Sequence, residues 1–398
     1  TPSWTMSWVA SKRFWAIGAL IILASHLLFK NSQSVSNIDT TVTPTAGDNT
    51  LIIPTKGQES PEENVNSVVN SNTPEMAKLL ENEILPRLGR IRKICGPLCE
   101  VDSATKLDAL TVKRNKRRDK ETMLPSVRAP VDCLAILKSE DIDASENSVP
   151  YPLPFELHSL YSLNGLVEIL NWGRHVNVYL GQEGKSTNWN EEKINDILNE
   201  LKDGVHLGTY GIKTTNSILH HLNVTRKILG SRVLVIGSEI PWLEAICLLL
   251  GAKEVVTLEY GKIVSTHPKI KTLTPSEFRK EYMDKSLGLF DTIVSFSSLE
   301  HSGLGRYGDA LNPWGDLLAV ARSWCVTRRG GALVLGLPTG KDRVMMNAHR
   351  VYGKFRWPLV ATNWIQVDSH LHNVTELAAE VLSNDHSVFV FEKLEGIK

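Results

Sequence analysis

The stretch "RVLVIGSEIPWLEA", residues 232–245, decides the fold. Four apolar residues, 233–236, lead directly into Gly237, which is typical of a strand buried on both faces of a parallel sheet. The apolar helical segment that follows tolerates Pro241 in its first turn and has Gly251 at its end. The stretch therefore predicts the strand, tight loop and helix with which many nucleotide-binding α/β domains begin.

The rest of the C-terminal half continues this alternation of helices and strands. Further strand-like segments are "EVVTLEY", "IKTL", "FDTIVSF", "GALVLGLP", "NWIQVD" and "SVFVFEKL". Their alternation with helical segments predicts an α/β domain with a doubly wound, mainly parallel, Rossmann-like sheet. Because only a short segment precedes the last strand, we expect that strand to pair antiparallel at one edge.

Composition sets limits on the class of protein. The chain has 398 residues, enough for one large domain or two modest ones. Lys+Arg and Asp+Glu both number 44, so the formal net charge is zero. Without an excess of positive charge, we expect no nucleic-acid partner.

The N-terminal part predicts a membrane protein. Residues 14–30 hold an apolar run with two basic residues before it, which predicts a transmembrane signal anchor of type II topology. Residues 1–13 are then cytosolic, and the C-terminal domain lies in the lumen of the endoplasmic reticulum or Golgi. A cleaved signal peptide is the alternative, but no clean small-residue cleavage site follows the run. Glycosylation sequons at Asn223 and Asn373 fit a luminal domain.

Three further regions follow this anchor. Residues 31–73 are rich in small polar residues and predict a disordered stem. Residues 74–150 form a helical and linker region, in which Pro86 should kink or split a helix. The α/β domain is expected to span residues 151–398.

The five cysteines fall into two groups. In an oxidising lumen, two of Cys95, Cys99 and Cys133 are available to pair. Cys247 and Cys325 lie in apolar helical stretches, which predicts buried thiols. The number is odd, so at least one cysteine stays unpaired within the chain. We expect no metal site, because no second cysteine pair stands at zinc-ligand spacing.

Several motifs together resemble a known class of enzyme. A strand, a glycine loop, a helix and a strand ending in Glu259, followed by "FDTIVSFSSLEH" and "RRGGALVLGLP", resemble class I S-adenosylmethionine-dependent methyltransferases. More narrowly, "SSLEHSGLGRYGDALNPWGD" and "NAHRVYGKFRW" resemble a family of uncharacterised proteins described mainly in nematodes and plants. The resemblance covers residues 153–394 and implies S-adenosylmethionine as the cofactor.

The expected cofactor site lies at the carboxyl ends of the strands, where the strand order switches. Gly237 has no Cβ, so the backbone there allows the methionine part of the cofactor to approach. Glu259 ends the second strand roughly 20 residues later, where a carboxylate accepts both ribose hydroxyls. The alternative for Glu259 is an exposed strand-end carboxylate. The predicted cofactor-binding residues are Gly237, Ser238, Glu239, Glu259, Ser297 and Ser298.

The same loop argues against a dinucleotide cofactor. A pyrophosphate needs the G-x-G-x-x-G pattern, whose later glycines are missing here. Glu239 would repel a phosphate, and Pro241 removes one backbone donor. A sulfonium cofactor carries no phosphate and tolerates a nearby carboxylate. Trp242 leaves open whether the loop shapes the pocket or closes it. Adenine recognition also stays open, with Ser276 and Glu277 as the available polar residues.

Methyl transfer to a hydroxyl needs a base, and histidine titrates in the right range. Glu300 and His301 come directly after the fourth strand, at the mouth of the expected site, and both are predicted catalytic residues. The alternative role of His301 is a structural loop histidine bonded to Glu300 or to the backbone. His349 is a second candidate base, with Arg350 as a candidate anchor for the acceptor.

Residues around "ALNPWG" offer further contacts. Asp309 and Asp316 flank this segment and could bind a metal or a sugar hydroxyl, although capping of the next helix by Asp316 is the better interpretation. Tyr307 and Trp314 would stack on a sugar face or pack a lid over the site.

Other enzyme classes have weaker support. The sequence has no G-x-S-x-G elbow and no P-loop lysine motif. "DID" at residues 141–143 matches the metal motif of glycosyltransferases by letters, but it precedes the α/β core. We therefore expect a methyltransferase of the secretory pathway that acts on a small-molecule or glycan hydroxyl. The alternative is a catalytically inactive binding or scaffold module with the same fold; the oligomeric state stays open.

Overall fold

A computed structural model describes residues 67–70, 72–100, 127–145, 148–170, 187–205, 208–369 and 386–394. The predicted cytosolic segment, the anchor at residues 14–30, most of the stem and the sequon at Asn373 lie outside these residues. Among the helices that are described, none is long and apolar enough to cross a membrane. The stem prediction is wrong for strand β1 (Ser67–Asn70), which pairs parallel with β2 (Ser148–Tyr151).

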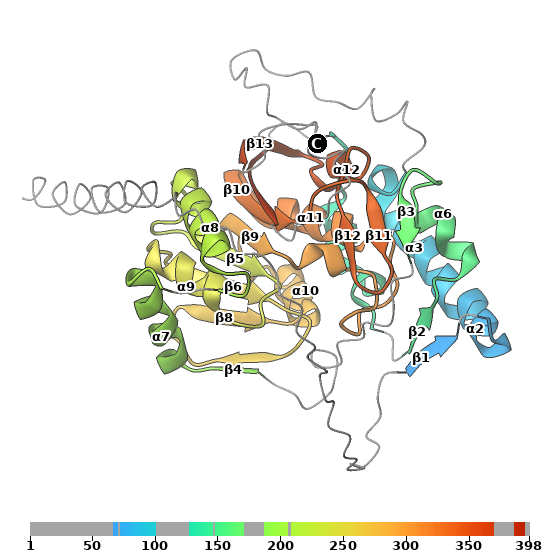
Figure 1. Cartoon of the computed structure of the whole chain (residues 1–398), viewed down its shortest axis with the longest axis horizontal. Coiled ribbons are helices and arrows are strands. Elements are labelled where there is room, and N and C mark those ends of the chain that lie inside the picture. The colour runs from blue at the N-terminus through green and yellow to red at the C-terminus, as the bar shows by residue number, and fades with distance from the viewer. Residues whose placement is uncertain are drawn as a thin grey trace, which may run out of the picture. The chain divides into compact units, whose positions relative to one another are not determined.

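The main sheet confirms the predicted α/β architecture (Figure 1). Across the sheet its strands are β8 (Ile270–Leu273), β6 (Glu254–Leu258), β5 (Arg232–Ile236), β9 (Phe290–Phe296), β10 (Thr327–Leu337), β14 (Ser387–Lys393) and β13 (Trp364–Ser369). Numbered along the chain within the sheet, this order is 3-2-1-4-5-7-6. The order reverses between β5 and β9, and open α/β sheets bind their ligands at such a switch point.

We expected the last strand, β14, to lie antiparallel at one edge of the sheet, but it lies one position inside the edge. β14 pairs antiparallel with both β10 and β13, so β13 forms the edge instead. This position satisfies the backbone groups on both sides of β14. It also explains the apolar run 388–391, whose side chains are all buried.

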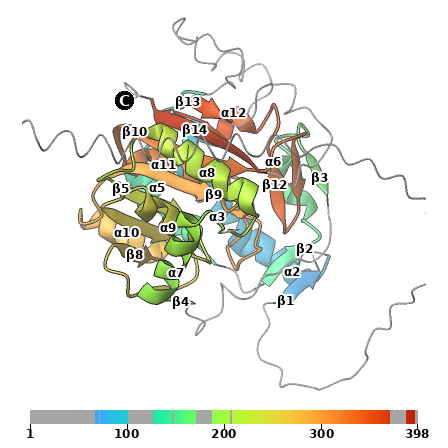
Figure 2. The same cartoon turned by 60° about the vertical axis from the view of Figure 1, so that its left-hand side comes forward.

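Helices cover both faces of the sheet (Figure 2). One face carries α7 (Glu191–Lys202), α8 (Ile212–Thr225) and α9 (Trp242–Leu249), and the other carries α10 (Pro275–Met283) and α11 (Gly315–Val326). Along β5 the side chains alternate: Val233 and Val235 pack with the first group, and Leu234 packs in the opposite core. The continuous apolar run of β5 therefore reports a strand buried on both faces.

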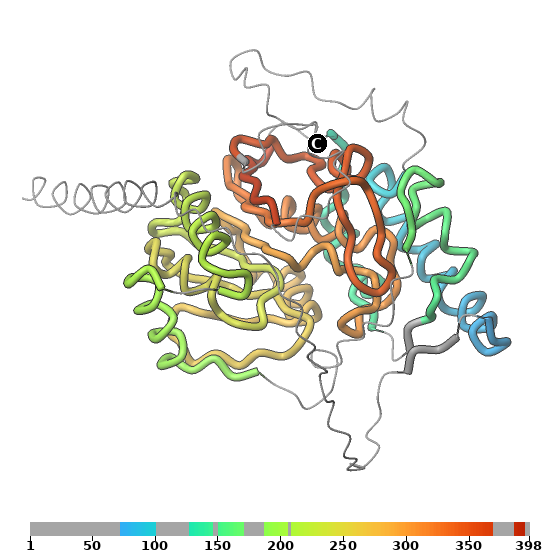
Figure 3. Tube along the Cα trace, viewed as in Figure 1, coloured from blue at the N-terminus to red at the C-terminus, as the bar shows by residue number. Residues whose placement is uncertain are grey.

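The core extends N-terminal of residue 151, where we had placed the start of the domain. A helical segment runs through α2 (Pro74–Leu79), the π-helical η1 (Leu80–Ile84) and α3 (Leu85–Cys95). Pro86 lies in the first turn of α3, directly after η1, so the helical segment continues past it and changes from π-helical to α-helical hydrogen bonding there. Figure 3 shows this segment in blue beside the later part of the chain. Its residues in the common core are Met76, Leu80, Ile84, Leu88 and Ile91.

Two disulfides fix the N-terminal elements. Cys95 and Cys99 are bonded, as the sequence allowed. Cys133, at the start of α5 (Cys133–Lys138), is bonded to Cys325 of α11, so the prediction of a free thiol at Cys325 is wrong. These partners are 192 residues apart, and nothing local in the sequence connects them. Cys247 is free and buried, as predicted.

Several short elements were not predicted. A small sheet joins β3 (Glu168–Leu170), β11 (Arg343–Met345) and β12 (His349–Val351), and β4 (Thr187–Trp189) pairs with β7 (Ile263–Ser265). The remaining elements are η2 (Gly96–Leu98), η3 (Asp141–Asp143), η4 (Phe155–Leu157), α6 (His158–Tyr161), η5 (Leu299–His301) and α12 (Trp357–Val360).

Candidate active site

A cavity of about 290 Å³ lies at the carboxyl ends of β5, β6 and β9, at the switch point of the sheet. A smaller cavity of about 70 Å³ shares Gly237 and Glu259 with it. The larger cavity brings together all the residues predicted to bind the cofactor: Gly237, Ser238, Glu239, Glu259, Ser297 and Ser298. The sequence pattern therefore identified one contiguous surface.

Gly237 is the close-approach point of this surface. Its φ is +75°, and its N–H donates to the carbonyl of Leu258 at 3.0 Å. A Cβ at this position would overlap the side chain of Ser298. Both the backbone conformation and the lack of space therefore require glycine.

Replacing Gly237 with alanine should lower the free energy of unfolding by about 2–4 kcal/mol, because left-handed strain and overlap add. Gly230 is a matched control: its φ is +70°, but a Cβ there would meet no atom within 4 Å beyond the neighbouring residues of the chain. Gly230→Ala should cost only about 1 kcal/mol. Urea denaturation of both variants measures the difference, and equal losses would contradict the close approach.

Glu259 is a buried carboxylate, 8% exposed, rather than an exposed one. Oε2 accepts the N–H of Ser238 at 2.8 Å, and Oε1 accepts the N–H of Tyr260 at 2.7 Å. Burial raises the pKa of this carboxyl to about 7, against the effect of the backbone donors. A carboxylate has about four lone-pair positions, so Glu259 keeps acceptor capacity on the cavity side.

Glu244 of α9 was missed in the sequence. It is fully buried; Oε2 accepts the Ser238 hydroxyl at 3.0 Å, and Oε1 accepts the Thr257 hydroxyl at 2.8 Å. Ser238 therefore links two carboxylates, through its hydroxyl to Glu244 and through its N–H to Glu259. These bonds hold the loop where a dinucleotide fold would have glycines. A lone acidic residue in the apolar helix "WLEAICLL" was the available signal.

Burial raises the pKa of Glu244 to about 7. Because the folded pKa exceeds the unfolded one, this group contributes stability below about pH 4.5 that is lost as the pH rises through 7. Glu244→Gln removes this pH-dependent contribution of about 3 kcal/mol. The free energy of unfolding of the variant should therefore fall less between pH 5 and pH 8 than that of wild type. Urea denaturation at several pH values measures this. Glu192→Gln changes an exposed residue and is the control. The same change of unfolding free energy with pH in wild type, Glu244→Gln and Glu192→Gln would contradict the prediction.

Trp242 and Glu239 shape the cavity rather than fill it. The buried indole of Trp242 packs edge-to-face on Phe296, with ring centroids 5.7 Å apart. The side chain of Glu239 is exposed, and its carbonyl accepts the Trp189 indole N–H at 3.2 Å. Both residues line a cavity that stays open between them. The loop is therefore compatible with a ligand.

His301 also lines the cavity. Its Nδ1 lies 2.6 Å from the carbonyl of Ala348, which can only accept, so Nδ1 carries the proton and Nε2 keeps a lone pair. Burial lowers the pKa of His301, and the neighbouring Arg306 guanidinium acts in the same direction. The imidazole is therefore neutral near pH 7 and able to accept a proton at Nε2.

Glu300 lies behind this surface and is fully buried. Its Oε1 accepts the Ser297 hydroxyl at 2.8 Å, and Oε2 has no hydrogen-bond partner among the described residues. Burial raises the pKa of Glu300, but His301 and His386 outweigh it, so the pKa lies below its ordinary value. Glu300 therefore lies beside both histidines, with Oε1 3.7 Å from His301 Nε2 and 3.3 Å from His386 Nε2.

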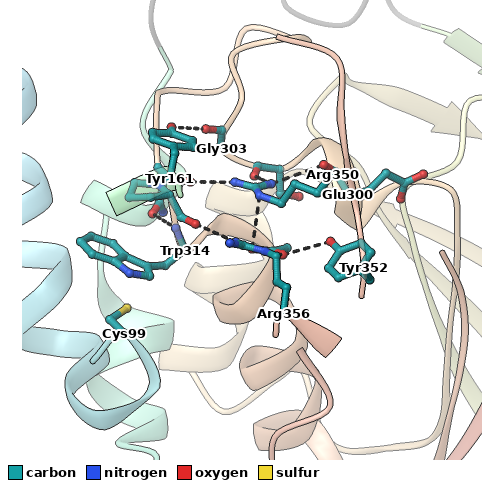
Figure 4. Close-up of polar contacts among 12 residues, drawn as sticks. Cys99, Tyr161, Glu300, Gly303, Trp314, Arg350, Tyr352 and Arg356 are labelled. Carbon is teal, nitrogen blue, oxygen red and sulfur yellow. Dashed lines mark hydrogen bonds and ion pairs between the residues drawn. The ribbon is translucent and has the colours of Figure 1, made fainter. Parts of the chain in front are cut away.

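Two residues proposed for catalysis stand elsewhere. The His349 ring lies 6.4 Å from that of His301 and does not line the cavity; burial lowers its pKa to about 4. Arg350 is fully buried and donates to the carbonyls of Glu300 and Ser302 (Figure 4). The predictions of a second base and of an acceptor anchor are therefore not supported. Arg350 instead holds the loop that carries His301.

We expected Asp316 to cap α11, but this prediction is wrong. The N-cap position is Trp314, and Asp316 lies inside the first turn of the helix. The Asp316 carboxylate is fully buried and accepts two hydrogen bonds from Arg356, at 2.8 and 2.6 Å. It also accepts the Tyr352 hydroxyl at 3.0 Å. Figure 4 shows Arg356 and Tyr352 beside Arg350 in this interior network. Its role is structural.

Asp309 shapes the loop after β9. The buried carboxylate accepts the N–H groups of Gly303 at 2.6 Å and Tyr307 at 3.2 Å. Tyr307 lines the cavity, whereas Trp314 is buried in the core. Within the described ranges, no group of three or more acidic, histidine or cysteine side chains is placed to hold a metal ion.

The adenine question has a partial answer. Glu277 forms a capping box with Thr274, and the Ser276 hydroxyl bonds to the Thr274 hydroxyl. Neither Glu277 nor Ser276 lines either of the two cavities described above. The smaller cavity instead offers apolar walls from Leu258, Pro275, Phe278 and Leu299.

The "DID" aspartates are ion-paired. Asp143 bonds Arg322 and Arg279, and Asp141 bonds Arg90. These arginines occupy the carboxylates that a glycosyltransferase would need for its metal.

Two further residues of the site were missed. The Tyr210 hydroxyl donates to Ser297 Oγ at 2.6 Å. His386 Nε2 lies 3.0 Å from the same oxygen and 3.3 Å from Glu300 Oε1. Both residues stand outside any motif in the sequence, and only the fold brings them to the end of β9.

A model of a known family matches the part of the chain that forms the main sheet. Residues 230–393 match the family described as "Caenorhabditis protein of unknown function, DUF268". The match covers less than half of the chain and includes the motifs that resemble a nematode family. The sheet order and the cavity define a class I methyltransferase-like domain. A comparison with curated proteins gives no match.

Three solved structures illustrate the likeness. The 1,6-didemethyltoxoflavin-N1-methyltransferase of Burkholderia thailandensis is 14% identical, with 51% of this chain and 87% of that chain covered and a TM-score of 0.32. A Galdieria sulphuraria protein described as a sarcosine dimethylglycine methyltransferase is 10% identical, with 52% and 99% covered and a TM-score of 0.33. A Streptococcus thermophilus protein described as a hemolysin is 14% identical, with 46% and 66% covered and a TM-score of 0.32. At these scores, the fold class rests on the strand order.

Proposed function

We propose that this protein is an S-adenosylmethionine-dependent methyltransferase. The observation that carries the proposal is Glu259, a buried carboxylate held by backbone amides at the end of the second strand. It faces a cavity whose glycine loop lacks the donors that a pyrophosphate needs. A cofactor with ribose hydroxyls and no phosphate fits both features.

The residues present fit that cofactor part by part. Glu259 would accept the ribose hydroxyls, and the bare backbone at Gly237 would admit the methionine part. The apolar walls of the smaller cavity suit an adenine ring, which presents large apolar faces. When bound, the cofactor supplies an electrophilic methyl group.

His301 would then act as the base. Nε2 of the neutral imidazole would accept the proton of an acceptor hydroxyl held beside it. The bond from Nδ1–H to Ala348 keeps Nε2 available, and Arg350 fixes the loop that carries the histidine. The structural and catalytic roles of His301 are therefore compatible.

The acceptor is proposed to be a glycan or small-molecule hydroxyl in the secretory lumen. Two disulfides fit an oxidising compartment, and Asn223 is an exposed sequon residue on α8. Tyr307 offers an aromatic face at the cavity for a sugar ring. The proposed anchor at residues 14–30 would keep the enzyme on the membrane.

Titration calorimetry of the full-length chain with S-adenosylmethionine tests the cofactor. Wild type should bind, and Glu259→Ala should bind roughly tenfold to a hundredfold more weakly, because two charge-assisted hydrogen bonds are lost. The exposed Glu192→Ala is the control and should bind like wild type. Absence of binding by wild type, or unchanged affinity in Glu259→Ala, would overturn the proposal. Binding of S-adenosylmethionine without methyl transfer to any acceptor would instead favour the inactive binding module. The missing glycines of the loop are the observation that supports this alternative.

A further inference from the structure

Among the described residues that line the larger cavity, Arg306 carries the one guanidinium. It lies on the same side as His301, with Nη1 3.3 Å from Nδ1 of that imidazole and 3.4 Å from the carbonyl of Ala348. The guanidinium also lies over the Tyr307 ring, 5.3 Å from the ring centroid. Arg306 is half-buried, so these contacts hold a cation beside the proposed base.

The loop after η5 is built to present Arg306. The Asp309 carboxylate accepts the N–H groups of Gly303 at 2.6 Å, Gly305 at 3.4 Å and Tyr307 at 3.2 Å. Gly303 and Gly305 have φ values of +78° and +74°, which glycine adopts without strain. The amides on both sides of Arg306 are therefore tied to one carboxylate, which fixes the position of this side chain at the cavity.

The guanidinium itself lacks a counterion. In the part of the chain that the structure describes, no carboxylate lies within ion-pair distance of Arg306, and neither Nε nor Nη2 has a hydrogen-bond partner. Arg356 and Arg90 use these same two atoms to bind the carboxylates of Asp316 and Asp141 at two points. A cation partly removed from water without a partner is unfavourable, so Arg306 is arranged for an anion that a ligand brings.

The other charges of the cavity limit this anion to a single charge. Glu259 and Asp309 also line the cavity, and backbone N–H groups hold both carboxyls. Glu239 lines it with an exposed side chain. Like charges repel at short range, so these three carboxyl groups disfavour a dianion such as a phosphate ester. A carboxylate brings one negative charge, which the Arg306 guanidinium balances.

We propose that Arg306 selects an acceptor that carries a carboxylate close to the hydroxyl that is methylated. The guanidinium binds the carboxylate while the hydroxyl faces His301, and the two groups are near enough for both to belong to one sugar ring or one small hydroxy acid. The acceptor is therefore an acidic sugar or a hydroxy acid. This inference rests on the proposed function, since it names the class of acceptor for that site. Arg306 takes the anchoring role that the sequence predicted for Arg350, which is fully buried.

Titration calorimetry of the full-length chain, saturated with S-adenosylhomocysteine, tests this with two matched pairs of probes. Glucuronate is paired with glucose, and lactate with propylene glycol; in each pair a carboxylate replaces a hydroxymethyl group. Wild type should bind at least one acid about tenfold more tightly than its neutral partner, because only the acid makes charge-assisted hydrogen bonds with Arg306. Glucose phosphorylated at its terminal carbon should bind more weakly than glucuronate.

Three variants assign the preference to one side chain. Arg306→Gln should lose the preference for the acids, whereas its affinity for S-adenosylhomocysteine should change less than about twofold, which also shows that it is folded. Arg306→Lys keeps the charge but loses the planar fork, so it should retain a preference of only about threefold. Arg92→Gln removes an exposed guanidinium from α3 and should leave every affinity unaltered.

Several results would overturn the carboxylate site and leave the proposed function standing. They are equal binding of the acids and their neutral partners by wild type, tighter binding of the phosphorylated sugar than of glucuronate, and an undiminished preference in Arg306→Gln. A large loss of S-adenosylhomocysteine affinity in a folded Arg306→Gln would place Arg306 at the cofactor instead and would also overturn the inference. Arg306→Lys decides the matter if Arg306→Gln does not fold, because an undiminished preference there contradicts the site. Failure of wild type to bind S-adenosylhomocysteine would overturn the proposed function itself.

Discussion

Asp316→Asn should lower the free energy of unfolding by about 3–5 kcal/mol, because it leaves buried guanidinium groups without a counterion. The Asp316 carboxylate accepts two hydrogen bonds from Arg356 and lies 3.8 Å from Arg350 Nε, and all three side chains are fully buried. A neutral amide cannot balance these charges. The loop after β9 should loosen as well, since Arg350 holds it through Ser302.

The matched control is Asp141→Asn. Asp141 also pairs with an arginine, but the Arg90 side chain is 57% exposed, so this change should cost less than about 1 kcal/mol. Urea denaturation of both variants at pH 7 makes the comparison. A loss at Asp316 as small as that at Asp141 would contradict the buried network.

The same ion pair predicts an acid limit. Burial raises the pKa of Asp316, but Arg350 and Arg356 outweigh it and hold the pKa below its ordinary value. A lowered folded pKa means that the contribution to stability is present above about pH 4 and is lost as the pH falls through the folded pKa. Wild type should therefore lose stability below pH 4 more steeply than Asp316→Asn does in the same denaturation experiment. Parallel acid limbs would contradict this.

The second large effect is expected at the disulfide between Cys133 and Cys325. It closes a sequence separation of 192 residues, whereas the bond between Cys95 and Cys99 closes one of only 4. In the chain-entropy account, removal costs about 5 kcal/mol for the long loop and about 2 kcal/mol for the short one. The long bond also ties α5 to α11. Arg322 of α11 contacts the same region, because it donates to the carbonyl of Ile136 in α5 and pairs with the carboxylate of Asp143.

Two double variants measure the difference. Cys133→Ala with Cys325→Ala should destabilise the protein at least twice as much as Cys95→Ala with Cys99→Ala in urea denaturation. Equal losses would show that the long bond adds nothing beyond the packing of α5.

The sheet and its ligand edge could be predicted because their signals are local. A run of apolar residues into Gly237 defines β5, and the spacing to Glu259 defines the end of β6. These positions follow from the geometry that every parallel α/β unit shares. The position of β14 could not be predicted, since its pairing partners are chosen by the finished sheet.

The interior of the site depends on contacts between distant segments. Tyr210 and His386 meet at Ser297, although 87 and 89 residues separate them from it. Arg350 was a candidate anchor for the acceptor because a charged residue in a motif suggests function, and Asp316 was expected to cap the next helix. Both side chains are fully buried, so their role is structural. The sequence does not show this burial, because it arises only from the packing of the folded chain.

The most direct measurement is a crystal structure of the protein with S-adenosylhomocysteine. The account predicts both ribose hydroxyl oxygens within about 2.6–3.2 Å of the Glu259 carboxylate, and the methionine part of the ligand beside Gly237. Electron density for the ligand away from Glu259, or an empty cavity at saturating ligand, would contradict it.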